Sequence, residues 1–226
     1  KGTTTWLRRK VLPGGGQGIR TFGNVIYSTH LGNEPDYDAN NPIVRGSQPV
    51  REKEYFTDAI TRESVDFIDR HSNKPFFLFV SYNAVHSPLQ AADKYMKKFK
   101  HIEDIQRRIF AAMLSNLDDS VGEILKKVEK EDLENDTLVF FLSDNGGPTK
   151  ELTSSNLPLR GGKGQMYEGG IRVPFLFKWP SKVPAGKTYD RPVLSTDIFA
   201  TIHAAAGVPK PKGEYIESYD LLPYLT

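Results

Sequence analysis

The residues best placed to do chemistry are Asp144 and Asn145, a carboxylate beside a neutral amide. Hard divalent cations such as Ca²⁺ and Mg²⁺ take oxygen ligands of this kind. Gly146 and Gly147 follow them and let the backbone turn sharply. These four residues could also form a simple turn, and a Ca²⁺ ion needs about six to eight oxygens. Their place directly after the apolar run 138–142 favours a metal site whose other ligands come from elsewhere.

Two further residues could act on an anionic substrate. His86 follows a second apolar run, 76–80, and could donate a hydrogen bond to an anionic oxygen or protonate a leaving group. Lys163 lies among the five glycines of 159–170 and could hold a tetrahedral anion. The spacing is not that of the nucleotide-binding phosphate loop. Taken singly, His86 is equally a packed or surface histidine and Lys163 a solvated lysine.

Together these features predict one site, in which a hard metal ion, a histidine and a lysine surround an anionic tetrahedral ester. Each of these groups would counter the negative charge that develops during phosphoryl or sulfuryl transfer. The joint pattern is therefore more specific than any of its parts.

The elements that must position these residues alternate between helix and strand. Helical spacing of apolar residues predicts helices at 54–70 and 105–130, and short apolar runs predict strands at 76–80, 138–142 and 173–178. A last helix is expected at 196–205, ended by Gly207 and Pro209. This alternation predicts an α/β fold, a sheet with helices on both faces. Continuous apolar runs are typical of parallel strands, and the ligand site of such a sheet lies beyond their carboxyl ends. His86 and Asp144 would then meet at one edge of the sheet.

The composition excludes several classes of protein. The 226 residues carry a net charge of +2, which argues against a nucleic-acid-coating protein. No apolar run approaches the ~18 residues of a membrane helix. The chain has no cysteine, so disulfide scaffolds, thiolate zinc sites and cysteine nucleophiles are excluded. Residues 1–50 are rich in turn-forming residues and are expected to be irregular and loop-rich, with a strand around 24–28.

Residues 51–226 resemble the C-terminal portion of the catalytic domain of type I sulfatases, in particular arylsulfatases and N-acetylgalactosamine-6-sulfatases. Three motifs carry the resemblance: Ser-Asp-Asn-Gly-Gly at 143–147, Arg-Gly-Gly-Lys-Gly at 160–164 and Tyr-Glu-Gly-Gly-Ile-Arg-Val-Pro at 167–174. Shorter stretches at 55–58, 83–90, 117–122 and 220–223 support it in the family's order. The resemblance implies an alkaline-phosphatase-like α/β fold and the hydrolysis of sulfuric esters.

The resemblance also implies a role for each candidate residue. Asp144 and Asn145 match ligands of a single Ca²⁺ ion. His86 matches the histidine that contacts the sulfate or the leaving oxygen, and Lys163 matches the sulfate-binding lysine. The expected partner is a sulfated small molecule or a sulfated glycan, with no nucleic acid and no membrane span. The family suggests a periplasmic, secreted or lysosomal setting.

The chain departs from the family in its nucleophile. Sulfatases use a formylglycine made from the cysteine of C-x-P-S-R, or from a serine in a similar context, and neither is found here. The family's N-terminal Asp pair, which completes the calcium site, is not visible either. We therefore expect a fragment that lacks the N-terminal part of the catalytic domain. Such a fragment would be marginally folded, because a sheet without its first strands exposes an apolar edge.

Two alternatives to a sulfatase stay open on the sequence alone. Phosphatases, phosphodiesterases and phosphomutases of the same superfold resemble Ser-Asp-His-Gly at the second strand end, where the histidine binds zinc or manganese. Asn145 stands at that position here, and an amide oxygen suits calcium better than a transition metal. A non-catalytic module for sulfated glycans would also retain His86 and Lys163, although no stripe of Arg and Lys is evident.

The purified 226-residue chain is expected not to hydrolyse a chromogenic aryl sulfate. A hydrolase without its nucleophile keeps only part of its transition-state stabilisation. Release of the coloured phenol, compared with a protein-free blank, measures this. Turnover above the blank would refute the expectation.

Overall fold

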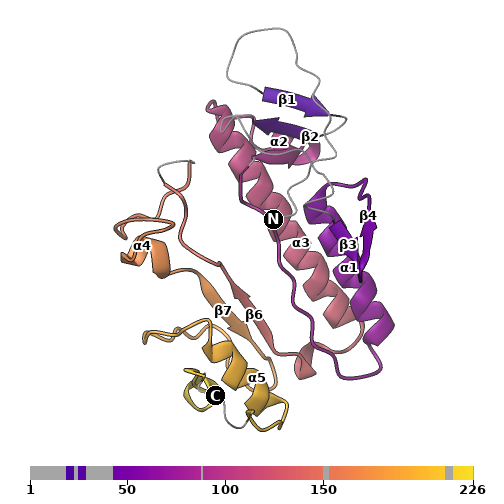
Figure 1. Ribbon diagram of the computed structural model, residues 1–226, viewed down its shortest axis with the longest axis vertical. Coiled ribbons are helices and arrows are strands. Elements are labelled where there is room, and N and C mark those ends of the chain that lie inside the picture. Colours follow the sequence, from indigo (N-terminus) through magenta and orange to yellow (C-terminus); the bar gives the residue numbers. More distant parts are fainter. Residues whose placement is uncertain are drawn as a thin grey trace.

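The computed structural model describes residues 19–22, 25–28, 43–87, 89–149, 153–211 and 216–225, along which helices and strands alternate (Figure 1). The helices are α1 (Phe56–His71), α2 (Asp93–Lys98), α3 (Ile105–Lys130), α4 (Glu168–Ile171), α5 (Asp197–Ala205) and α6 (Leu222–Leu225), with a 3-10 turn η1 (Glu134–Asp136). The strands are β1 (Ile19–Phe22), β2 (Val25–Ser28), β3 (Ile43–Arg45), β4 (Gln48–Val50), β5 (Gln90–Ala92), β6 (Val139–Leu142) and β7 (Phe175–Lys178). The chain is thus α/β, as the sequence predicts.

The strands are distributed over three small sheets. β2 pairs with both β1 and β5, β3 pairs with β4, and β6 pairs with β7. Every pairing within the described residues is antiparallel, so the predicted parallel arrangement is wrong. In the β6–β7 hairpin Leu142 lies opposite Phe175, so the carboxyl end of β6 and the amino end of β7 share one end. The long loop between these strands therefore leaves and returns at the same place.

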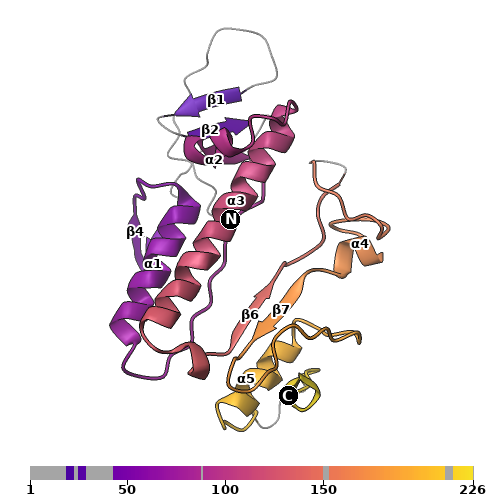
Figure 2. The ribbon, with the colours of Figure 1, turned by 180° about the vertical axis from the view of Figure 1, so that it is seen from behind.

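The long helices α1 and α3 lie side by side, and the β6–β7 hairpin lies apart from them on the side of α3 (Figures 1 and 2). Asp104 caps α3, because its side chain accepts a hydrogen bond from the Arg107 N–H at 2.7 Å. Across the helix pair, the buried Asn116 donates its amide to Asp58 Oδ1 at 2.8 Å. This polar link fixes how the two helices align.

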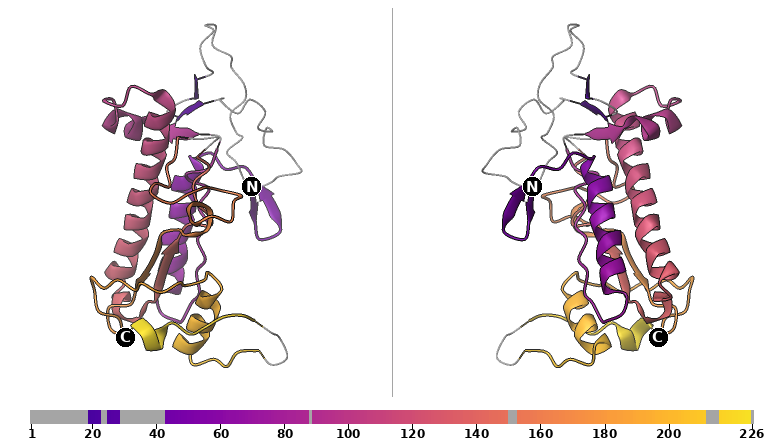
Figure 3. Two further views of the ribbon diagram at one scale, coloured as in Figure 1. Left: turned by 90° about the vertical axis from the view of Figure 1, so that its left-hand side faces the viewer. Right: turned by 90° about the vertical axis from the view of Figure 1, so that its right-hand side faces the viewer.

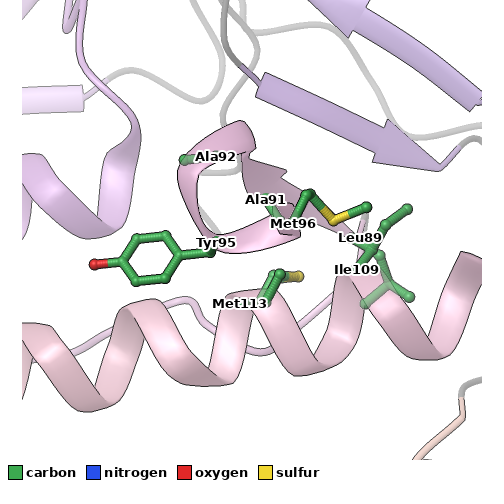
Figure 4. Close-up of a cluster of buried hydrophobic side chains, with 8 residues drawn as sticks. Leu89, Ala91, Ala92, Tyr95, Met96, Ile109 and Met113 are labelled. Atoms are coloured by element: carbon green, nitrogen blue, oxygen red, sulfur yellow. The ribbon is translucent and has the colours of Figure 1, made fainter. Parts of the chain in front are cut away.

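An apolar core lies between β5, α2 and α3 (Figure 4). Its members are buried: Leu89, Ala91, Ala92, Tyr95, Met96, Ile109, Ala112 and Met113. Tyr55, just before α1, is buried too and donates its hydroxyl to the carbonyl of Gln90. Burial raises the pKa of the Tyr55 hydroxyl, so the group stays protonated and keeps this bond. The bond ties the start of α1 to β5.

The ends of the molecule are occupied by different elements. Figure 3 shows α5 and α6 near one end of the long helices and β1 and β2 near the other. In the β6–β7 hairpin, Phe140 packs edge-on against Phe177 at 5.0 Å between ring centroids. α4 lies toward the end of the hairpin where the long loop leaves (Figure 1). None of the helices described is long and apolar enough to cross a membrane.

The segment 76–80, predicted as a strand covered on both faces, pairs with no strand in the described part of the chain. Phe77 is 69% exposed and Phe79 77% exposed, whereas the other three side chains are half-buried. The prediction is therefore wrong on two counts, pairing and burial. The alternation with a period of two is typical of an extended segment with one covered face.

Most other predicted elements are confirmed within two residues: helices 54–70 (α1), 105–130 (α3) and 196–205 (α5), and strands 24–28 (β2), 138–142 (β6) and 173–178 (β7). The sequence missed β5 and α2. The first 50 residues include four short strands, β1 to β4. Much of that segment lies outside the described residues, so its loop-rich character stays a prediction.

The substitution Ile109→Ala in α3 is expected to lower the free energy of unfolding by about 2–5 kcal/mol. Ile109 is 0% exposed, so its truncation leaves a cavity in the core. Leu114→Ala on the same helix is the control, because Leu114 is 49% exposed and its loss should cost far less. Urea unfolding followed by circular dichroism measures both values, and equal losses would contradict the described core.

Candidate active site

The strand β6 ends in a turn that its own short hydrogen bonds hold together. The Ser143 N–H donates to the Pro174 carbonyl at 3.2 Å, and the Ser143 hydroxyl donates to the Asn145 carbonyl at 2.9 Å. Asp144 Oδ1 accepts from the Asn145 N–H at 2.9 Å, and Asn145 Nδ2 donates to the Gly146 carbonyl at 3.0 Å. The turn therefore presents its carboxylate and its amide oxygen in a defined orientation.

The donor chemistry of this turn fits part of a calcium shell. Asp144 is exposed and Asn145 half-buried. Within the described residues, no protein group donates to Asp144 Oδ2 or to Asn145 Oδ1. Oxygens of this kind are what a hard cation takes. No group of three or more His, Cys, Asp or Glu side chains that could hold a metal occurs in that part of the chain, so a complete shell needs further oxygens.

The turn packs backbone to backbone against the glycine-rich segment that carries Lys163. The Gly146 N–H donates to the Gly170 carbonyl at 2.9 Å, and the Lys163 N–H donates to the Gly147 carbonyl at 3.2 Å. A Cβ atom on Gly146 would lie 1.8 Å from the carbonyl oxygen of Gly169. Only glycine fits there, because real Cβ atoms do not approach an oxygen so closely. These glycines thus allow two segments of this chain to meet.

The side chains of Lys163 and His86 meet beside the Asp144–Asn145 turn, although they are far apart in the sequence. The surface formed by these four residues is called the rim. Lys163 Nζ lies 3.0 Å from His86 Nε2, and both residues are exposed. Because a lysine ammonium can only donate, His86 Nε2 accepts, and the ring hydrogen is assigned to Nδ1. His86 Nδ1 accordingly lies 2.7 Å from the Ser87 carbonyl, to which it donates. The His86 N–H donates to the Asn83 carbonyl at 2.8 Å, which fixes this turn.

The structure therefore brings the predicted residues to one rim of the molecule. His86 contacts Lys163 directly, and the Lys163 backbone bonds to Gly147, which closely follows Asp144 and Asn145. Among the described residues no parallel strands lie behind these side chains. The prediction that they meet at the edge of a parallel sheet is therefore wrong about the cause, although His86 and Lys163 do meet. The residues come together because the loop of the β6–β7 hairpin packs the segment of Lys163 against the turn that follows β6, and not because they share the edge of a sheet.

Aromatic and charged contacts support the segment that follows Lys163. The guanidinium of Arg160 stacks over the Tyr167 ring at 3.9 Å from its centroid. Arg172 lies 3.7 Å from the Glu168 carboxylate across α4. Both pairs are exposed and contribute modestly to stability.

One residue of this arrangement was missed from the sequence. The side chain of Asn156 forms three hydrogen bonds to the backbone of the two packed segments. In the sequence Asn156 stands before Leu157-Pro158, where an asparagine is an ordinary turn former. No spacing or charge pattern distinguishes it from the other turn-forming residues nearby.

The comparisons with known proteins agree on one family. A family model described as Sulfatase matches residues 1–208. Human steryl-sulfatase is 36% identical over 176 residues, which cover 75% of this chain and 29% of that protein. N-acetylgalactosamine-6-sulfatase of Canis lupus familiaris is 33% identical over 172 residues, which cover 74% of this chain and 32% of the relative. The chain thus spans about a third of the length of these relatives.

Solved structures show the same similarity in three dimensions. The crystal structure of Ps i-CgsB superposes with a TM-score of 0.78 at 38% identity, covering 86% of this chain and 44% of that chain. Its complex with k-i-k-neocarrahexaose superposes with a TM-score of 0.77 at 40% identity, over 80% of this chain and 41% of that chain. A sulfatase from Pseudoalteromonas sp. reaches a TM-score of 0.67 at 28% identity, over 80% of this chain and 37% of that one. These neighbours share the α/β fold predicted above.

The substitution Gly146→Ala is expected to lower the free energy of unfolding by about 1–3 kcal/mol, because the new methyl group forces the two packed segments apart. Gly122→Ala is the matched control. Gly122 lies in α3 with open space around its Cα, so alanine there should stabilise the helix by roughly 0.5–1 kcal/mol. Opposite signs in urea unfolding are the expected outcome, and a neutral Gly146→Ala would mean that the segments are not in contact.

Proposed function

Because this chain belongs to the sulfatase family, we propose that its rim supplies part of the active site of a sulfuric ester hydrolase. The observation that carries the proposal is the 3.0 Å contact between Lys163 Nζ and His86 Nε2 beside the Asp144–Asn145 turn. Together these residues offer the cationic and hydrogen-bonding groups that an anionic tetrahedral ester needs. The motifs around them fall in the order expected for the family.

Lys163 would hold the sulfate and His86 would act at the leaving oxygen. A sulfate oxygen that enters between their nitrogen atoms can accept from the Lys163 ammonium. His86 Nε2 accepts in the present arrangement, so it must carry a hydrogen before it can donate to the substrate. A protonated His86 could then transfer that proton from Nε2 to the departing alcohol oxygen, as a nucleophile bonds to sulfur and the sulfur–oxygen ester bond breaks.

Asp144 and Asn145 would hold the Ca²⁺ ion that sulfatases generally use. When bound, the ion supplies positive charge beside the sulfate group. The Asp144 carboxylate and the Asn145 amide oxygen would contribute two of its ligands, and the remaining oxygens would have to come from outside the turn. Sulfatases also generally use a formylglycine nucleophile, for which this chain has no cysteine precursor.

The comparisons favour a sulfate ester of a small molecule or a glycan as the substrate. Relatives named steryl-sulfatase and N-acetylgalactosamine-6-sulfatase support these two kinds of substrate, and the structural neighbour in complex with k-i-k-neocarrahexaose supports a carbohydrate. By the same reasoning we infer a periplasmic, secreted or lysosomal location. Asn145, in place of a histidine, favours calcium over zinc or manganese and hence a sulfatase over a phosphatase of the same superfold.

The substitution Lys163→Ala is expected to weaken the binding of inorganic sulfate to this chain about tenfold or more, because a hydrogen bond to a charged group is lost. Calorimetric titration with sodium sulfate measures the change in Kd. The control is Lys97→Ala on α2, because Lys97 is also an exposed lysine but pairs with Asp93 at 2.7 Å. Equal Kd values for Lys163→Ala and the unmodified chain would contradict the role of Lys163.

A second measurement separates the sulfatase from a zinc-dependent phosphatase. Calcium added to the chain is expected to tighten sulfate binding, and Asp144→Asn is expected to weaken that calcium effect because a ligand charge is removed. Metal analysis after equilibration with equal calcium and zinc provides the complementary readout. Stoichiometric zinc at this turn would overturn the choice of a sulfate ester.

A further inference from the structure

We propose that Asn156 is a positioning residue of this site, whose side-chain amide holds the segment of Lys163 against the turn of Asp144 and Asn145. The consequence for sulfate binding rests on the proposed function. The link between the two segments rests on hydrogen bonds alone and can be tested separately.

Both polar atoms of the Asn156 side-chain amide are bonded to the two segments. Its Oδ1 accepts from the Gly147 N–H at 3.0 Å. Its Nδ2 donates to the Gly147 carbonyl at 2.9 Å and to the Gly161 carbonyl at 3.0 Å. One planar group thus binds the N–H and the carbonyl of Gly147 in one segment and the carbonyl of Gly161 in the other. Neither a hydroxyl nor a carboxylate provides this combination of one acceptor and two donors.

The two anchor points of Asn156 lie next to the residues that it would position. Gly147 closely follows Asp144 and Asn145, and Gly161 closely precedes Lys163. The Gly147 carbonyl accepts from Asn156 and also from the Lys163 N–H at 3.2 Å. The same oxygen therefore holds the side chain of Asn156 and the backbone of Lys163. Loss of the amide would leave Lys163 attached to the turn through its own N–H alone at this point.

The packing around Asn156 leaves little freedom for a substitute. A Cβ atom on Gly162 would lie 3.1 Å from Asn156 Nδ2 and 2.5 Å from the Gly147 carbonyl oxygen. The amide therefore fits because the neighbouring residue is glycine. Asn156 itself is half-buried, so water can replace some of its bonds but cannot bridge both segments in the same geometry.

The effect of Asn156 on a substrate would pass through Lys163. Lys163 Nζ reaches His86 Nε2 at 3.0 Å from a backbone whose position the Asn156 bonds help to set. A long flexible side chain keeps its tip in place only if its Cα is held. Asn156 therefore affects where the ammonium sits, while its own polar atoms are bonded to the backbone.

Three variants test this inference. Asn156→Ala removes the amide. Asn156→Asp keeps an acceptor for the Gly147 N–H and keeps a turn-forming side chain, but it places a carboxylate oxygen against two carbonyl oxygens. If Asn156 served only to form a turn, aspartate would replace it. Ser155→Ala is the matched control, because the Ser155 hydroxyl accepts only from the nearby Leu157 N–H at 3.3 Å in the described structure.

The primary readout is amide hydrogen exchange, followed residue by residue by NMR on the full 226-residue chain. In Asn156→Ala and Asn156→Asp the N–H groups of Gly147 and Lys163 are expected to exchange at least tenfold faster. The amides of Ile109 and Met113 in the α3 core should keep their rates, which separates a local effect from a loss of folding. Ser155→Ala should leave all four rates unchanged.

The second readout is the affinity for inorganic sulfate, which we expect to fall about fivefold or more in both Asn156 variants and to stay unchanged in Ser155→Ala. Unchanged exchange at Gly147 and Lys163, or an Asn156→Asp variant that behaves like the unmodified chain, would overturn the inference. Equally faster exchange in α3 would also overturn it, because Asn156 would then support the whole fold. Absence of sulfate binding by the unmodified chain would instead count against the proposed function, and the exchange rates would still decide the link.

Discussion

The site depends on the close approach of two backbone segments, the turn after β6 and the segment that carries Lys163. Where they touch, at Gly146 and Gly169, there is no room for a side chain. At such a contact each buried N–H and carbonyl needs a partner, because an unpaired one costs about 1–3 kcal/mol. The Gly146 N–H donates to the Gly170 carbonyl, and the Gly147 carbonyl accepts from the Lys163 N–H and from Asn156 Nδ2. Hydrogen bonds of the main chain thus set the position of the Lys163 backbone relative to Asp144. This constraint explains why glycines surround the lysine without forming a phosphate loop.

The site also joins two parts of the fold that are supported separately. Asp144 and Lys163 belong to the loop of the β6–β7 hairpin, whereas His86 follows the segment 76–80 beside the long helices. That segment is held by contacts such as Phe76 against Phe67 of α1, edge-on with 5.8 Å between ring centroids. The apolar core lies among β5, α2 and α3 (Figure 4). The contact between His86 and Lys163 therefore depends on the relative placement of hairpin and helices.

The sequence predicted what depends on local pattern and missed what depends on distant partners. The helices α1 and α3 followed from the spacing of their apolar residues. Asp144, Asn145 and His86 followed from residue types after apolar runs, and Lys163 from its place in a glycine-rich segment. The strand at 76–80 failed because pairing requires a neighbour, which an apolar run does not reveal. β5 was missed because Gln-Ala-Ala has low strand propensity and pairs with β2 from far along the chain. Asn156 was missed for a similar reason, since its three bonds reach backbone atoms that no side-chain pattern marks.

The exposure of the rim limits what its charges can do alone. Asp144, His86 and Lys163 are all exposed. Two unit charges about 4 Å apart interact by about 1 kcal/mol in water but by about 4 kcal/mol at an effective dielectric of about 20. The rim therefore provides geometry more than electrostatic strength. The rate of an ester hydrolysis depends on preorganised charge in a site that excludes water. If this chain acts on a sulfate ester as proposed, water must be excluded from the rim before its charges reach that strength.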